Sequence, residues 1–218
     1  MHFLLCAATA FEIAPTIEYL NTHPLGEEHK VDILITGVGL LPAAFHITQQ
    51  IIQHRPQYII QAGVAGSIDK NLLLGETVLV QQEQIGDSGV YEDGKFTTLF
   101  DMALAEKNQY PWTDGWLVNK DMAHISAAGL KSVSGVTVNE ITTHSERIAY
   151  YQQCGAQVET LEGAALHYAG LMMDIPFLQI RSISNYVGER NKQNWKLKEA
   201  IVNLNHQLQH ILIKLLTI

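Results

Sequence analysis

Two isolated acids stand out in this sequence because both lie next to apolar segments. Glu12 follows the apolar residues 3–8, and Glu162 lies within residues 158–165, between a short predicted strand and a helix rich in small residues. An acid at the start of a helix is ordinary, because it complements the helix dipole. If both carboxylates face one cleft, one can act as a general base while the other accepts hydrogen bonds from hydroxyl groups. Helix capping and catalysis therefore both remain open at these positions.

A second candidate is the segment 180–188, where a predicted strand turns polar at its end and carries Ser184 and Asn185. The Asn side chain holds a donor and an acceptor in one plane, which suits recognition of the edge of a heterocyclic base. A lone Asn is also typical of a turn. Base recognition and a plain turn are both compatible with this segment.

A third candidate is the glycine-rich segment 63–67, which follows the apolar residues 58–62. Glycines after a strand let the backbone approach a ligand closely and expose N–H donors, and a tight turn is the alternative. No Gly-Lys-Ser/Thr follows this segment, and no GxGxxG motif opens a helix in the chain. The sequence therefore indicates neither a mononucleotide phosphate loop nor a dinucleotide-binding oxidoreductase.

Alternating strands and helices must position these residues. Short apolar segments predict strands at 3–8, 31–36, 58–62, 75–80, 115–118, 131–138 and 177–183, and a polar stretch of loop and edge strand up to Lys95. Periodic segments predict helices at 13–20, 43–54, 142–153, 162–172 and 197–215. This order predicts an α/β three-layer sandwich with a mixed, largely parallel central sheet. Function is then expected at the C-terminal ends of the strands.

Length and composition narrow the class of protein. The 218 residues favour one domain, 1–218, and the hydrophobic content of 47% with 17% charged residues excludes a disordered chain. Two cysteines, Cys6 and Cys154, exclude a disulfide scaffold and are expected to be buried thiols. The net charge of -8 argues against nucleic-acid binding, which depends on neutralising phosphates.

The sequence lacks the patterns typical of a signal peptide, a membrane helix and a metal site. The first residues lack the basic region of a signal peptide, and no apolar segment approaches the ~20 residues that a membrane helix needs. We therefore expect a cytoplasmic protein that does not bind a membrane. The ten histidines show no metal-ligand spacing, so no metal and no cofactor are expected.

Five segments carry a resemblance that spans almost the whole chain. In order and spacing they resemble the nucleoside phosphorylase and nucleosidase superfamily, and in particular its 5′-methylthioadenosine nucleosidase branch. These segments are 7–12 (AATAFE), 36–39 (TGVG), 61–66 (QAGVAG), 161–165 (LEGAA) and 175–185 (IPFLQIRSISN). Residues 184–192, followed by Trp195, are similar to the futalosine hydrolase family, which are nucleosidases of menaquinone biosynthesis.

The resemblance implies a nucleoside phosphorylase-like fold and a role for each matched position. It implies that Glu12 activates the attacking water, that Glu162 accepts hydrogen bonds from ribose hydroxyls, and that Asn185 contacts the leaving purine. The further substrate-binding positions are Gly63, Val64, Ala65, Val138, Asn139, Leu161 and Ser184. Val138 departs from the family, which has an aromatic residue there, and Val64 departs from the serine of adenine-specific relatives.

The identity of residue 185 predicts which purine is released. The resemblance places Asn185 where adenine-specific nucleosidases carry an aspartate that donates a proton to purine N7. An asparagine can accept from a protonated N7 while its NH₂ donates to a 6-oxo group. A mismatched buried donor or acceptor costs about 1–3 kcal/mol. We therefore predict a 6-oxopurine nucleoside as substrate, with futalosine first among candidates and hypoxanthine as the released base.

The arginine count favours water over phosphate as the nucleophile. The chain has only Arg55, Arg147, Arg181 and Arg190, and none lies in the first 54 residues, where bacterial phosphorylases of this superfamily place phosphate-binding arginines. A methylthioadenosine/S-adenosylhomocysteine nucleosidase, a purine nucleoside phosphorylase and a non-catalytic nucleoside-binding module remain as alternatives. The resemblance also implies a homo-oligomer in which neighbouring subunits complete the pocket.

Overall fold

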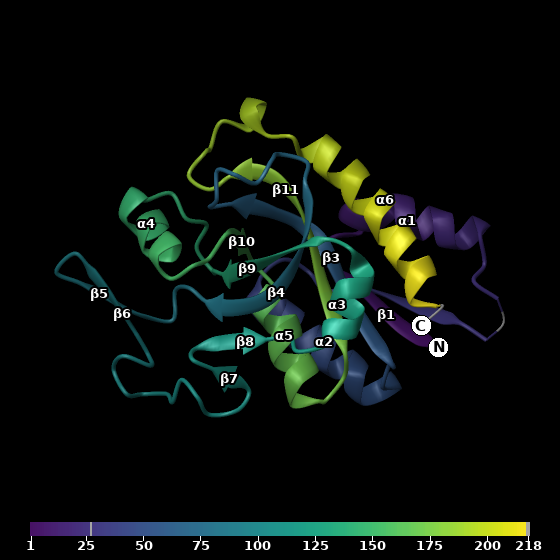
Figure 1. The fold of residues 1–218 in the computed structure, drawn as a ribbon, viewed down its shortest axis with the longest axis horizontal. Coiled ribbons are helices and arrows are strands. Elements are labelled where there is room, and N and C mark those ends of the chain that lie inside the picture. Colours follow the sequence, from purple (N-terminus) through teal and green to yellow (C-terminus); the bar gives the residue numbers. More distant parts are fainter. Residues whose placement is uncertain (27, 217–218) are drawn as a thin grey trace.

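The computed structural model describes residues 1–26 and 28–216, which form three layers (Figure 1). The middle layer is a mixed sheet with the strand order β2-β1-β3-β10-β9-β4-β8-β7, and β11 pairs with both β3 and β4. Its strands are β1 (His2–Ala7), β2 (Lys30–Ile35), β3 (Tyr58–Ser67), β4 (Thr77–Ile85), β7 (Trp112–Thr113), β8 (Trp116–Val118), β9 (Lys131–Thr137), β10 (Val158–Thr160) and β11 (Phe177–Tyr186). The predicted three-layer α/β class is confirmed.

Helices cover both faces of this sheet. They are α1 (Ala10–Thr22), α2 (Leu40–His54), α3 (Met122–Ala128), α4 (Ser145–Gln153), α5 (Gly163–Met172) and α6 (Leu197–Leu215), with a 3₁₀ turn η1 (Lys192–Asn194). A hairpin of β5 (Gly89–Glu92) and β6 (Lys95–Thr98) extends away from the sheet (Figure 1). Among the helices of the described segments, none is both long and apolar enough to cross a membrane.

Strand β1 shows why both faces must be covered. Its side chains alternate between the two faces, as the period of a strand requires. Phe3 and Leu5 pack in the cluster that includes α1, α3 and α6, whereas Leu4 and Cys6 pack in the cluster of α2 and α5. A strand that is apolar on both sides is typical of a sheet with helices on both faces.

Helix α6 matches its predicted boundaries and buries its predicted apolar stripe except at the first position, Leu197, which is exposed. The other periodic residues are buried, namely Ile201, Leu204, Leu208, Ile211, Leu212 and Leu215. A polar contact interrupts this stripe at Asn205, whose Nδ2 donates to the Glu12 carbonyl and whose Oδ1 accepts from Thr16. Because α1 and α6 lie side by side, this contact fixes the first turn of α1 (Figure 1).

Several elements extend further than predicted. Residues 63–67, expected as a loop after the third strand, are the second half of β3. They are held in a strand because β11 pairs with them on one side and β10 on the other. Likewise, β4 and β11 reach Ile85 and Tyr186, beyond their predicted ends, and α3 was not predicted at all. Of the two cysteines, Cys6 is buried as expected, but Cys154 at the end of α4 is partly exposed.

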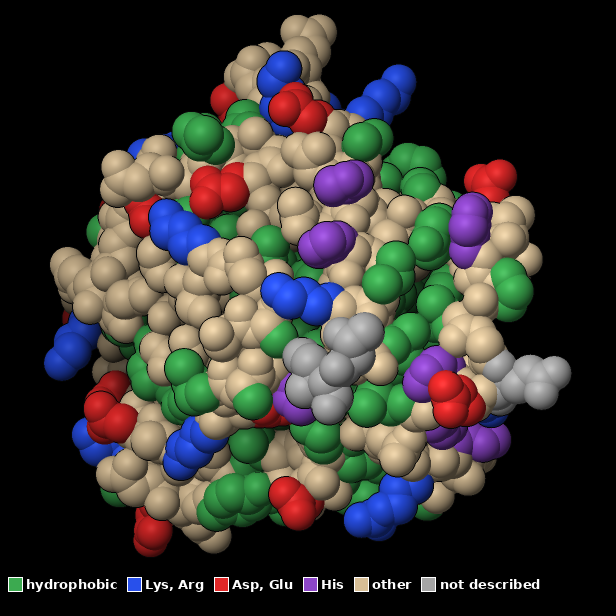
Figure 2. Space-filling model, turned by 45° about the vertical axis from the view of Figure 1, so that its right-hand side comes forward, with side chains coloured by type: hydrophobic (Ala, Val, Ile, Leu, Met, Phe, Trp, Pro, Cys, Tyr) green, Lys and Arg blue, Asp and Glu red, His purple; other side chains and the backbone are tan. Residues whose placement is uncertain are grey.

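The surface around α1, α6 and the chain ends carries both signs of charge. In Figure 2, the Lys and Arg side chains on this face lie apart from one another, among acids and histidines. Such a mixed face does not provide the continuous basic surface on which phosphate contacts depend.

Candidate active site

A cavity of about 330 Å³ opens where the parallel strands β1, β3 and β11 end. Glu12, Glu162 and Asn185 all line this cavity, although they come from distant parts of the chain. The C-terminal edge of such a sheet is the usual place for a ligand site, because the connecting loops deliver polar groups there. We call it the acid-lined cavity.

Glu12 is held at the start of α1 by three donors. Its Oε2 accepts from the Thr9 backbone N–H at 3.0 Å and from the Thr9 hydroxyl at 2.9 Å, and its Oε1 accepts from the Val64 N–H at 3.1 Å. Glu12 therefore caps the helix and also lines the cavity. Gly63 allows this close approach, because a Cβ there would lie 2.9 Å from Glu12 Oε1.

Glu162 lies directly before α5 and contacts one backbone donor and one side-chain donor. Its Oε1 accepts from the Gly39 N–H at 3.0 Å, and its Oε2 lies 3.5 Å from Arg181 Nη1. Arg181 is buried, and its Nη2 donates to Gln61 Oε1 at 2.9 Å. The guanidinium also lies close to Gly63, where a Cβ would come 2.5 Å from Arg181 Nη1. No role is predicted for Arg181 from the sequence, although a lone arginine inside an apolar strand indicates a buried ion pair.

Asn185 reaches the cavity through an irregularity in β11. Ile183 pairs with Ala65 and Asn185 with Gly66, so Ser184 is an extra residue in the register. A bulge of this kind redirects the side chains next to it. Asn185 Oδ1 accepts from the Ser184 hydroxyl at 2.8 Å, and its Nδ2 donates to the Tyr186 carbonyl at 3.1 Å. One N–H and one lone pair of the amide are left over for a ligand.

The remaining expected substrate-binding residues divide into two groups. Those that line the cavity are Val64, Ala65, Leu161 and Ser184. Gly63, Val138 and Asn139 do not line it. Val138 is fully buried in an apolar cluster, and Asn139 is exposed and bonded to Asp87.

The structure therefore places Val138 and Asn139, where a base contact is expected from the sequence, outside the lining of the cavity. The Val138 N–H bonds to the Thr160 carbonyl at 3.0 Å, which continues the pairing of β9 with β10 and keeps the side chain in the core. The chain reaches the cavity later, at Ile141. Glu159 and Trp195, which are not predicted as site residues from the sequence, also line the cavity. Glu159 could have been noticed as a second acid in the segment that contains Glu162.

A sealed polar cluster lies beneath the start of α5. Fully buried Glu83 accepts from Gln179 Nε2 at 2.8 Å and from the hydroxyls of Thr160 and Thr137, each at 3.1 Å. These hydroxyls in turn accept from the first N–H groups of the α5 region, Gly163 at 3.2 Å and Ala164 at 2.8 Å. Burial raises the pKa of Glu83 to about 7, and the hydrogen bond from Gln179 opposes this shift. The cluster ties the helix start that carries Glu162 to the sheet.

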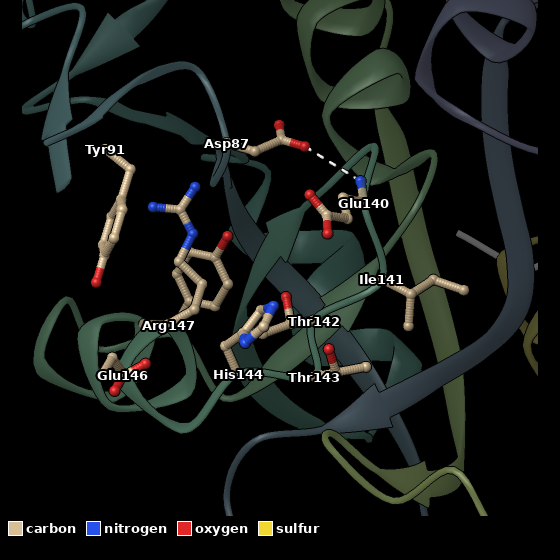
Figure 3. Close-up of a pocket in the computed structure, with 10 residues that line it drawn as sticks. Asp87, Tyr91, Glu140, Ile141, Thr142, Thr143, His144, Glu146 and Arg147 are labelled. Carbon is tan, nitrogen blue, oxygen red and sulfur yellow. Dashed lines mark hydrogen bonds between the residues drawn. The ribbon is translucent and has the colours of Figure 1, made fainter. Parts of the chain in front are cut away.

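A second cavity of about 320 Å³ lies between α4 and the β5–β6 hairpin (Figure 3). Asp87 accepts from the Glu140 N–H at its edge, and Arg147 lies with its guanidinium carbon 3.7 Å from the centre of the Phe96 ring. Ile141 lines both this cavity and the acid-lined cavity. Glu12, Glu162 and Asn185 do not face the second cavity.

The fold and the acid-lined cavity together define an α/β protein with buried acids at the C-terminal edge of a mixed sheet. The family model described as "Phosphorylase superfamily" matches residues 12–217. The chain therefore belongs to the phosphorylase superfamily, and the resemblance drawn from the sequence is confirmed.

Individual relatives narrow the class of reaction. Futalosine hydrolase from Thermus thermophilus is 30% identical over 183 residues, covering 82% of this chain and 80% of that protein. The 5′-methylthioadenosine/S-adenosylhomocysteine nucleosidase of Maridesulfovibrio salexigens is 25% identical over 170 residues, covering 73% and 70%. The native structure of Helicobacter pylori futalosine hydrolase superposes with a TM-score of 0.80 at 17% identity, covering 96% of each chain. Futalosine hydrolases and 5′-methylthioadenosine/S-adenosylhomocysteine nucleosidases are both N-glycosyl hydrolases, which is the class of enzyme predicted from the sequence.

Proposed function

We propose that this protein, as a single nucleosidase domain, hydrolyses the N-glycosidic bond of futalosine and releases hypoxanthine and dehypoxanthine futalosine, a step of menaquinone biosynthesis. The observation that carries the proposal is that Glu12, Glu162 and Asn185 line one cavity. The similarity to futalosine hydrolase of Thermus thermophilus supports the choice of substrate.

The acids suit the charges that this reaction develops. Cleavage of an N-glycosidic bond builds positive charge on the ribosyl ring, as in glycoside hydrolysis. Glu12 orients a water on the face of the ring opposite the base and accepts its proton. Glu162 accepts hydrogen bonds from the ribose hydroxyls and places negative charge beside the developing cation. The Gly39 N–H and Arg181 hold Glu162 in position for this role.

Asn185 stabilises the leaving base. Its free lone pair accepts from a protonated N7, while its second N–H donates to the 6-oxo group. The bonds to Ser184 and Tyr186 fix the amide in one orientation, so the donor and acceptor cannot exchange places freely. This arrangement favours a 6-oxopurine over a 6-aminopurine.

Water is the nucleophile that the charges favour over phosphate. Phosphate sites usually offer arginine forks that are free to bind two oxygens. In Arg181, Nη2 already donates to Gln61 Oε1, and Nη1 lies 3.5 Å from Glu162 Oε2. Glu12 would also repel an anion at the place of the nucleophile.

A methylthioadenosine/S-adenosylhomocysteine nucleosidase is the second candidate, favoured by the similarity to the Maridesulfovibrio salexigens protein. Asn185 argues against it, because that reaction releases a 6-aminopurine. Release of adenine from methylthioadenosine faster than hypoxanthine from futalosine would establish this alternative.

The assembly that we propose is a homo-oligomer. Phe11 and Val38 line the acid-lined cavity and yet are 64% and 57% exposed, and Leu41 and Phe45 nearby on α2 are also exposed. A second copy of this chain would cover these apolar side chains and close the cavity. Light scattering after gel filtration tests this, and a Leu41→Asp variant should shift the assembly toward the monomer.

The direct test of the function is to incubate the purified protein with futalosine in phosphate-free buffer and to measure hypoxanthine by chromatography. We expect hypoxanthine to appear without phosphate. A reaction that requires phosphate would instead indicate a phosphorylase.

A further inference from the structure

The segment that connects β11 to α6 brings a positive charge to the acid-lined cavity (Figure 1). Arg190 and Trp195 of this segment line the cavity, together with the three acids Glu12, Glu159 and Glu162. Among the lining residues of the described chain, Arg190 is the only lysine, arginine or histidine. The cavity therefore has one place where a positive charge is open to a ligand.

Hydrogen bonds within this segment hold Arg190 beside the indole of Trp195. The guanidinium carbon lies 5.8 Å from the centre of the Trp195 ring, a distance at which a cation and an aromatic ring attract each other. Trp195 Nε1 donates to the Glu189 carbonyl at 3.0 Å. The Glu189 carboxylate accepts from the Asn191 N–H and from Asn194 Nδ2, each at 2.7 Å. The turn is thus braced from within, and it presents a flat ring next to a guanidinium.

The donors of Arg190 are free for a ligand. Within the described segments, the exposed Arg190 side chain forms neither a hydrogen bond nor a close ion pair. Its charge acts at longer range on Glu159, where burial raises the pKa and Arg190 opposes this shift. Arg181 differs, because it is buried and donates to Gln61. A free guanidinium can bind a carboxylate through two parallel hydrogen bonds.

Futalosine carries a carboxylate at the end of its 5′ chain. It is a 6-oxopurine nucleoside whose 5′ end is extended by a chain that ends in a benzoate group, whereas methylthioadenosine ends there in a neutral methylthio group. In a β-nucleoside, the base and the 5′ carbon lie on one face of the ribose ring, and the 2′ and 3′ hydroxyls lie on the other. With the hydroxyls at Glu162 and the water at Glu12, the 5′ chain points away from both acids.

We propose that Arg190 binds the carboxylate of the benzoate group and that Trp195 packs against its ring. This inference rests on the proposed function and adds a contact at the 5′ end of the substrate. A planar aryl ring suits stacking on an indole, and the carboxylate suits the guanidinium beside it. The contact selects futalosine over nucleosides with a neutral 5′ group and does not involve the reacting carbon.

An Arg190→Met substitution tests the contact, because it removes the charge and keeps a side chain that can pack on Trp195. Arg190 is exposed, so we expect the variant to fold as the wild-type protein does. The KM for futalosine should rise by about 10- to 100-fold, the effect of losing a hydrogen bond between charged groups. The kcat should keep its wild-type value, because the contact is equal in the ground state and the transition state. Steady-state release of hypoxanthine measures both constants.

Lys192→Met is the matched control. Lys192 is an exposed cation in the same turn, and it does not line the cavity. The KM for futalosine should be the same in this variant as in the wild-type protein. An equal rise in both variants would reflect net charge alone and would overturn the inference, as would an unchanged KM in Arg190→Met.

The methyl ester of futalosine tests the same contact from the side of the substrate. The ester keeps the base and the ribose but lacks the negative charge, so its KM with the wild-type protein should exceed that of futalosine. Arg190→Met should not distinguish the acid from the ester. If the substitution weakens both compounds equally, Arg190 acts on the part that they share, and the inference is overturned. Failure of the proposed function gives a different result, in which the wild-type protein releases hypoxanthine from neither compound.

Discussion

Buried acids occupy two neighbouring regions of this protein, and the two regions use them differently. In the sealed cluster, both oxygens of Glu83 accept hydrogen bonds from side chains that the fold itself provides. In the acid-lined cavity, Glu12 and Glu162 are held by backbone N–H groups and Arg181, and one oxygen of Glu159 has no partner among the described residues. Satisfied acids position the scaffold, whereas acids at the cavity retain capacity for a ligand.

The start of α5 connects the two regions. Thr160 bonds to Glu83 on one side, and Leu161 and Glu162, the next two residues, line the cavity. The hydrogen bonds from Glu83 through Thr160 and Thr137 to the first N–H groups of α5 hold this turn against the sheet. We therefore expect substitutions in the cavity to change the reaction and substitutions in the sealed cluster to change stability.

The largest expected effect is on catalysis, in Glu12→Gln. The loss of a positioned general base should lower turnover of futalosine by about 10²- to 10⁴-fold. Affinity for hypoxanthine should remain, because the base contacts lie at Asn185. Glu18→Gln, an exposed acid in the same helix, is the control and should retain activity. Wild-type turnover in Glu12→Gln would show that Glu12 has only a structural role, as Glu83 does.

The next effect is on stability, in Arg181→Met. Removing one partner of a buried ion pair costs about 3–5 kcal/mol, because the other charge is left unpaired. Denaturant unfolding should show this loss, and a Glu162→Leu, Arg181→Met double variant should recover part of it. If the double variant is less stable than Arg181→Met alone, the contact between the two side chains is not what stabilises them.

A smaller effect is expected on specificity, in Asn185→Asp. A protonated aspartate can donate to N7 and accept from a 6-amino group, so the preference should move toward the 6-amino analogue of futalosine by about 5- to 150-fold. Ratios of kcat/KM for the two substrates measure the change. A ratio equal to that of the wild-type protein would remove Asn185 from the specificity argument.

The smallest effect is the pH dependence of stability contributed by Glu83. Because folding raises its pKa from 4.5 to about 7, the folded state holds a proton that the unfolded state releases earlier. The contribution of Glu83 to stability is therefore fully present below about pH 4.5 and declines as the pH rises to about 7. The stability of the wild-type protein relative to Glu83→Gln should fall over this window. A difference that is constant with pH would mean that Glu83 does not titrate there.

Local patterns in the sequence were sufficient for much of the fold. The apolar period of α6 and the short apolar strands predicted both the helix and the layers that it covers. Long-range pairing was not visible, and it is pairing with β10 and β11 that turns the expected glycine loop into the second half of β3.

The candidate site, like the fold, was predictable from the sequence only where local patterns carry the information. The positions of Glu12, Glu162 and Asn185 could be proposed because each ends or follows an apolar segment. That Arg181 and Glu159 belong to the site could not be predicted, because this depends on which strands lie side by side. Val138 lies outside the cavity lining for a related reason, since a hydrogen bond to Thr160 keeps that residue in the core.

The central claim is that Glu12 delivers water to the ribosyl carbon of a 6-oxopurine nucleoside. The measurement that tests it most directly is the reaction of futalosine in H₂¹⁸O without phosphate, followed by mass spectrometry of the sugar product. We predict that ¹⁸O enters the sugar product at the carbon that held the base, and that Glu12→Gln abolishes most of this incorporation. Release of hypoxanthine with no ¹⁸O in the sugar, or undiminished incorporation in the variant, would contradict the account.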